Sequence, residues 1–129
     1  MSHHQLQSPS SLAHLARIRD FCTKLPEVEE KADEFGHTTF RVKDKPFIML
    51  GENDGQVSTA LKTELTTQEF LLGQEGTAYQ KTPYIGRHGW VSIWNVDLVP
   101  WTEIQDLIVE GYARTAPKKL VQQLKSTKS

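Results

Sequence analysis

The feature that most constrains the fold is a series of short strand patterns joined by tight-turn signals in the first half of the chain. Residues 38–42 alternate apolar and polar side chains, which is typical of a half-buried strand. Residues 43–46 are typical of a turn, and an apolar run follows at residues 47–50. The Asn-Asp-Gly sequence at residues 53–55 predicts a hairpin because Asp-Gly tolerates positive φ angles, and a partner strand is expected at residues 57–61. This pattern predicts an antiparallel meander.

A helical pattern precedes the meander. Residues 12–25 carry apolar side chains at spacings of three and four, which indicates an amphipathic helix. Ser10 and Ser11 are suited to cap its start through their hydroxyls. The pattern places His14 and Arg17 on the face toward water.

The second half of the chain predicts shorter elements and then helices. Residues 66–69, Thr-Thr-Gln-Glu, fit a capping box at the start of a short helix that Gly73 ends. Residues 74–83 are expected to form a loop with one brief strand, and residues 89–96 a strand that is apolar on both faces. A helix is predicted from Pro100. A last short amphipathic helix is predicted at residues 118–125.

Composition fits one small domain. The 129 residues carry a formal net charge of -1, so the chain lacks the overall basic excess of a dedicated nucleic-acid binder. The single cysteine, Cys22, excludes an intramolecular disulfide, and without a membrane-spanning or leader pattern we expect a cytoplasmic protein. We expect an α+β two-layer sandwich over residues 10–125, with an antiparallel sheet covered by N-terminal and C-terminal helices. We expect a disordered tail at residues 1–9 and a frayed tail at residues 126–129.

A glycine-flanked basic pair stands before the last predicted strand. Gly86 and Gly89 would let backbone amides point into a common hollow, and Arg87 adds five donors, so this segment is a candidate site for a phosphate or carboxylate. The alternative is a plain turn with a solvated arginine and a core tryptophan. The residues proposed for this ligand site are Tyr84, Arg87, His88 and Trp90.

Cations also gather around the first predicted hairpin. Together with Lys62 they would form a basic ridge able to meet the sugar-phosphate backbone of DNA. Charged residues also protect exposed sheet edges from aggregation, which is the alternative reading. Glu52 and Asp54, at the second hairpin, would repel phosphate. The proposed DNA-binding residues are Arg41, Lys43, Lys45, Lys62, Arg87 and His88.

Catalytic and metal-binding patterns are absent from the sequence. No nucleophile triad, phosphate loop or histidine spacing suited to zinc occurs. A histidine such as His88 beside a carboxylate would suit acid-base chemistry, but nothing in the sequence indicates that such a pair meets in space. We therefore expect neither enzymatic activity nor a metal or cofactor.

Positions dispersed between Phe21 and Leu124 match a known pattern. They are Leu25-Pro26 with Glu29, Phe35-Gly36, Phe40-Arg41-Val42, Lys45, Phe47, Leu61-Lys62, Gly86, His88, Trp90, Val91, Leu98, Ile104, Leu107, Ile108, Tyr112 and Lys118-Lys119-Leu120. On these positions the chain resembles the MmcQ/YjbR family of small bacterial proteins.

The resemblance implies a CyaY-like sandwich and a role in DNA binding, in which two β-hairpins act as wings on the duplex. By position, the first wing would carry Arg41, Lys43 and Lys45, and the second would be the hairpin at residues 53–55. Weak DNA binding with little sequence preference is therefore the leading hypothesis. A small anionic ligand at the glycine-flanked segment and a protein-interaction role are the alternatives.

Overall fold

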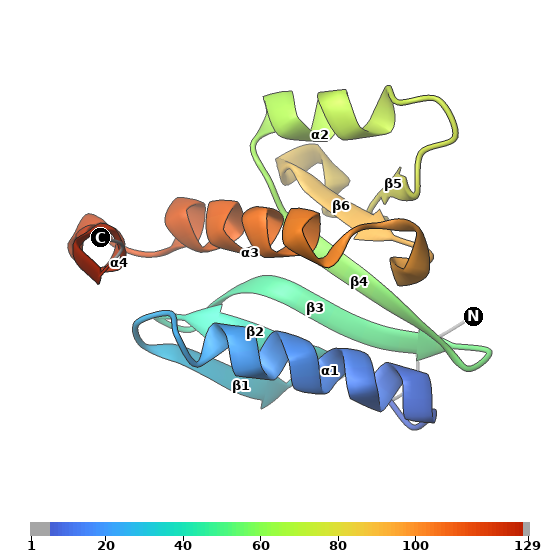
Figure 1. Cartoon of the computed structure of the whole chain (residues 1–129), viewed down its shortest axis with the longest axis horizontal. Helices are drawn as coiled ribbons and strands as arrows, with labels where there is room; N and C mark the ends of the chain where they lie inside the picture. Colours follow the sequence, from blue (N-terminus) through green and yellow to red (C-terminus); the bar gives the residue numbers. More distant parts are fainter. Residues whose placement is uncertain (1–5, 128–129) are drawn as a thin grey trace.

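The computed structural model describes residues 6–127 and shows an antiparallel sheet with helices packed on one face (Figure 1). The strands are β1 (Val28–Ala32), β2 (Thr38–Val42), β3 (Lys45–Asn53), β4 (Gln56–Lys62), β5 (Tyr79–Lys81) and β6 (Trp90–Ile93), in the order β1-β2-β3-β4-β6-β5. The helices are α1 (Pro9–Cys22), α2 (Leu65–Leu72), α3 (Trp101–Thr115) and α4 (Lys118–Thr127), with short 3-10 turns η1 (Gly86–His88) and η2 (Val96–Leu98). The predicted α+β sandwich is confirmed.

The core lies between the sheet and the pair α1 and α3. Alternate strand residues such as Leu50, Leu61 and Ile93 are fully buried, and Ile18 of α1 and Ile108 of α3 pack against them. In Figure 1 both helices lie in front of the sheet, while α2 lies beside the edge formed by β5 and β6. The two-layer arrangement follows from strands with one apolar face and helices with one apolar stripe.

Both predicted tight turns are present. Lys43 and Asp44 have φ of 51° and 64°, and Asp54 and Gly55 have φ of 53° and 79°. Positive φ at both central residues is the geometry whose twist matches that of antiparallel strands. The first turn is shorter than predicted, because β3 begins at Lys45.

Helix α1 buries the predicted apolar residues Leu15, Ile18 and Cys22 but departs from the predicted pattern at two positions. Leu12 is 47% exposed, whereas His14 is 5% exposed. The imidazole Nε2 of His14 lies 3.0 Å from the hydroxyl of Thr59 on β4, and this hydrogen bond makes the burial of a polar ring tolerable. The prediction that His14 faces water is therefore wrong.

The start of α1 also differs from the prediction. Ser8, not Ser10 or Ser11, is the N-cap, and its hydroxyl accepts a hydrogen bond from the Ser11 amide. Leu6 packs against the core, so contacts with the domain begin before Ser10. The predicted tails extend into residues 1–5 and 128–129, which lie outside the described part of the chain.

Two further local predictions need correction. Helix α2 begins at Leu65 with Glu64 as N-cap and no side-chain capping bond, so the predicted capping box is not formed. Instead, the carboxylate of Glu110 on α3 accepts hydrogen bonds from the Glu64 amide and the Thr67 hydroxyl. The edge strand β1 was not predicted. Its exposed, charged sequence lacks the apolar alternation of a half-buried strand.

No helix within residues 6–127 combines the length and the hydropathy that crossing a membrane requires.

Candidate functional site

Three cations from separate elements meet at one end of the sheet. Strand β3 begins there with Lys45, β4 ends there with Lys62, and α3 carries Arg114 there in its last turn. The register of β3 and β4 pairs Ile48 with Leu61, which places Lys62 beside the first residues of β3. We call the group formed by Lys45, Lys62 and Arg114 the basic end.

A glycine in α3 brings this helix onto the sheet at the basic end. A Cβ atom on Gly111 would lie 2.7 Å from the carbonyl oxygen of Lys62 and 3.6 Å from that of Phe47. Only glycine allows the helix to approach so closely without displacing β4. Arg114 lies three residues later on the same helix, about one turn beyond this contact. The close packing therefore carries its guanidinium toward the two lysines.

The three cations act on one another. Partial burial lowers the pKa of Lys62, and the charges of Arg114 and Lys45 lower it further. Arg114 has an acidic partner, with its Nη1 3.7 Å from the carboxylate of Glu64. Within residues 6–124, neither Lys45 nor Lys62 forms an ion pair within 4.0 Å of an acidic side chain. The basic end thus carries positive charge that the protein itself compensates only in part.

The other two cations of the first hairpin are engaged within the protein. Lys43 Nζ donates to Glu27 at 2.7 Å. Arg41 donates from Nε to the Thr39 hydroxyl at 2.9 Å and from Nη1 to the Asp44 carbonyl at 3.2 Å. The Asp44 carboxylate also lies 3.9 Å from Arg41. Arg41 and Lys43 are therefore bonded within the protein, and we do not count them among the cations of the basic end.

The second hairpin lies at the other end of β3. This strand is nine residues long, so its two ends lie about 27 Å apart at the usual rise per residue. Glu52 accepts hydrogen bonds from the amides of Ser8 and Gln7, which lower its pKa to about 2. This hairpin is anionic and tied to the start of α1. The two hairpins thus present opposite charges from opposite ends of one strand.

The glycine-flanked segment forms a closed turn. The amide of Gly86 donates to the Thr82 carbonyl, that of His88 to Ile85, and that of Gly89 to Gly86. These amides are therefore used within the turn, and the predicted anion-binding hollow is not formed by them.

Packing, rather than ligand binding, explains Gly89. Its φ is 96°, and a Cβ atom there would lie 2.1 Å from the Thr63 carbonyl oxygen. The Gly89 carbonyl in turn accepts bonds from the amide and the hydroxyl of Thr63. This contact fixes the entry into β6, where Trp90 pairs with Lys62.

The side chains proposed for the small-ligand site point to different environments. Trp90 is 5% exposed and belongs to the interior, whereas Tyr84 is 98% exposed. Arg87 and His88 are exposed neighbours, with Arg87 Nε 3.3 Å from His88 Nε2. The structure brings Arg87 and His88 together but does not place Tyr84 and Trp90 around them as walls.

Arg114 was missed in the sequence because it is far from the other cations along the chain. Gly111, one turn before it, was the available signal, since a glycine inside an amphipathic helix often marks a close approach to a neighbouring backbone. That signal would have placed the end of α3 against a strand, but not against Lys62 in particular.

Other chemistry has little support in the described part of the chain. Among the described residues, no group of three or more His, Cys, Asp or Glu is arranged to hold a metal ion. Cys22 is buried, and burial raises the pKa of its thiol to about 12, so the reactive thiolate is scarce at neutral pH.

Comparison with known proteins adds the family. The family model described as YjbR matches residues 23–114, from the end of α1 to Arg114. No curated protein matches the chain. The matched region holds the entire sheet, both hairpins and all three members of the basic end. The chain belongs to the YjbR family.

Proposed function

We propose that this protein binds the phosphate backbone of DNA weakly, with little preference for base sequence, and does so through the basic end. The observation that carries the proposal is the proximity of Arg114 and Lys45 to Lys62: burial lowers the pKa of Lys62, and these two charges lower it further. A phosphate placed among these cations would relieve their repulsion. The proposed role is one of binding, without catalysis.

Weak affinity follows from the small number of available cations. The basic end supplies Lys45 and Lys62, which are unpaired within residues 6–124, together with Arg114, whose contact with Glu64 a phosphate would have to replace. Arg87 would add a fourth cation, because η1 leads into β6 at the strand end that pairs with Lys62. Contacts of this kind release counterions, and the logarithm of the binding constant falls by about 0.9 per phosphate contact for each tenfold rise in salt. Three or four contacts predict a slope of about -3.

The low sequence preference follows from the kind of side chain involved. Base edges are read mainly by side chains that enter a groove on a projecting helix or ribbon. Here the cations lie at strand and helix ends, and the hairpin beside them holds Arg41 and Lys43 in internal bonds. Backbone contact is therefore the mode of binding that this surface favours.

The test is fluorescence anisotropy on a short labelled DNA duplex over a series of salt concentrations. Replacing Lys45 and Lys62 together by glutamine should reduce the affinity and flatten the salt slope by about 2. Lys43→Gln is the matched control, since this lysine is paired with Glu27 and should change the slope by less than one contact.

Two results would overturn the proposal. One is the absence of binding at low salt by the wild-type protein. The other is a larger effect of Lys43→Gln than of the double substitution, which would place the contact surface on the hairpin turn instead of the basic end.

A further inference from the structure

A small cleft lies between α1 and the segment that connects β6 to α3. Its volume is about 210 Å³, and it is lined by His14, Arg17, Val96, Asp97, Val99, Trp101 and Ile104. Typical pockets for drug-sized ligands measure roughly 300–1,000 Å³, so only a smaller molecule fits here. We call this the His14 cleft. It lies at the start of α3, whereas the basic end lies at the end of the same helix.

The base of the cleft is buried and carries one polar group. Val99 and Ile104 are 7% and 2% exposed, and His14 is 5% exposed. One imidazole nitrogen of His14 is bonded to the Thr59 hydroxyl at 3.0 Å. His14 lines the cleft, and within the described residues its other ring nitrogen has no hydrogen bond, so it can serve a ligand as donor or acceptor according to the tautomer.

The rim carries two opposite charges. Arg17 on α1 and Asp97 on η2 are both exposed, and both act on His14: the charge of Arg17 lowers its pKa and that of Asp97 raises it. Within the described residues these two side chains do not form an ion pair within 4.0 Å. A guanidinium and a carboxylate therefore face the same opening without neutralising each other by contact.

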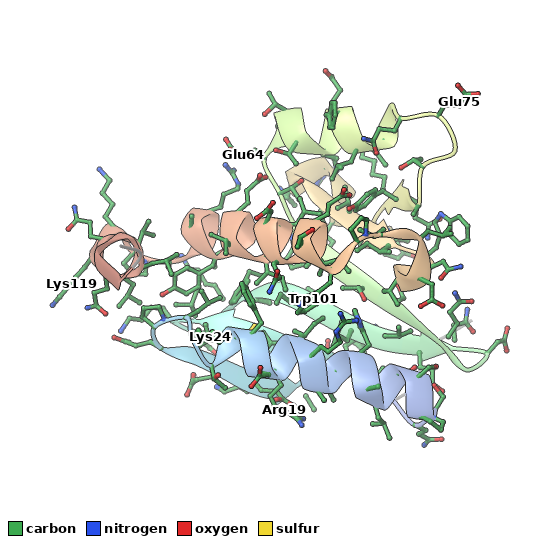
Figure 2. All side chains as sticks on the ribbon, viewed as in Figure 1. Arg19, Lys24, Glu64, Glu75, Trp101 and Lys119 are labelled. Atoms are coloured by element: carbon green, nitrogen blue, oxygen red, sulfur yellow. The ribbon has the colours of Figure 1, made fainter. Side chains whose placement is uncertain are left out.

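An aromatic contact holds the guanidinium in place. The Arg17 guanidinium carbon lies 4.6 Å from the centre of a Trp101 ring, a cation–π arrangement. Trp101 is itself held by an edge contact with Phe21, at 6.2 Å between ring centres. Figure 2 shows Trp101 in the space between α1 and α3. Because Arg17 is positioned on a ring and not on an acid, its donors remain available for a ligand.

The charge pattern selects one class of ligand. A simple anion would be attracted by Arg17 but repelled by Asp97, and a simple cation would meet the reverse. A molecule with both charges satisfies both groups at once. We propose that the His14 cleft binds a small zwitterion of the α-amino acid type, with its carboxylate on Arg17, its ammonium group on Asp97 and a hydrogen bond to the free nitrogen of His14.

Protein NMR titration tests this proposal with three probes of similar size. L-alanine carries both charges, propionate only the negative one and isopropylamine only the positive one. Amide signals of residues lining the cleft should shift on addition of L-alanine, at concentrations about tenfold or more below those needed for either single-charge probe. The signals of the basic end should not change with L-alanine.

Substitutions at the rim give the second arm of the test. Arg17→Gln and Asp97→Asn should each weaken L-alanine binding about tenfold or more, since each removes a charge-assisted bond. Arg19→Gln is the matched control, because Arg19 lies on the same helix but is paired with Glu30 at 2.7 Å outside the cleft. It should leave L-alanine binding unchanged.

Three outcomes would overturn the proposal. They are equal shifts with all three probes, no shifts at the cleft with L-alanine, and L-alanine binding that survives both rim substitutions. Arg17 and Asp97 are both exposed, so we expect the two variants to fold. Their unfolding curves check this.

Discussion

The basic end and the His14 cleft lie at opposite ends of α3, and each contains a basic side chain whose pKa is lowered first of all by burial. Their neighbours differ. Lys62 has two further cations beside it, whereas His14 has one cation and one anion. The basic end therefore gathers charge of one sign, and the cleft presents charges of both signs. Burial alone does not define a site; the neighbouring charges decide which ligand it suits.

The largest expected effect concerns how rigidly the basic end is held. Gly89→Ala should destabilise the protein by about 3 kcal/mol or more, because the new Cβ meets the Thr63 carbonyl and the φ of 96° is strained. Gly76→Ala is the control, since Gly76 also has positive φ, 66°, but open space around it. It should cost about 1 kcal/mol. Chemical denaturation measures both. Equal losses of stability in the two variants would mean that the contact between Gly89 and the Thr63 carbonyl does not fix the start of β6.

The second prediction addresses the cleft through pH. The pKa of His14 falls from 6.5 to about 4 in the folded protein, because burial disfavours the charged ring. The unfolded chain therefore binds the proton more strongly, and stability is lost as pH falls from about 6.5 toward about 4. The loss at this residue should reach up to about 3 kcal/mol.

His14→Gln isolates this contribution. Glutamine does not titrate, so the difference in unfolding free energy between wild type and variant should shrink as the pH is lowered through this window. Urea denaturation at a series of pH values measures it. A constant difference from pH 7 to pH 4 would show that His14 is not buried in its neutral form.

The third prediction tests whether internal ion pairs limit the number of cations at the first hairpin. Glu27→Gln removes the partner of Lys43, so the freed lysine should strengthen DNA binding and steepen the salt slope by up to about 0.9. Glu34→Gln changes the net charge equally at an exposed carboxylate and serves as control. Anisotropy titrations of both variants with DNA test this prediction. Equal gains in DNA affinity would indicate an effect of net charge alone.

The smallest effect is on the stability of the basic end itself. Since the pKa of Lys62 lies below its ordinary 10.5, its charged form is disfavoured at neutral pH, and this cost is relieved as pH rises toward that value. Lys62→Met should therefore stabilise the fold by a few tenths of a kcal/mol while weakening DNA binding. Lys24→Met, at an exposed position, is the control and should change neither the stability of the fold nor DNA binding. A loss of stability in Lys62→Met would argue against crowding of like charges.

Features set by neighbouring residues could be predicted from the sequence, whereas features set by long-range contacts could not. The second hairpin follows from local chemistry, since Asp54-Gly55 specifies its turn, and the alternating strand before Lys43 and Asp44 indicates the first. The burial of His14 in α1 does not follow from local chemistry, because it depends on a hydroxyl 45 residues away on β4. The basic end can be predicted from the sequence only in part. Lys45 and Lys62 belong to one hairpin pattern, but the approach of Arg114 depends on long-range packing, as does the pairing of Lys43 with Glu27.

Mapping the DNA-contact surface by NMR tests the central claim most directly. On addition of a short duplex at low salt, amide signals should shift around Lys45, Lys62 and Arg114, and the side-chain pKa of Lys62 should rise as phosphate relieves its repulsion. Signals of the hairpin at residues 53–55 and of the His14 cleft should stay unchanged. Shifts centred on that hairpin, or a Lys62 pKa that does not respond to DNA, would contradict the account.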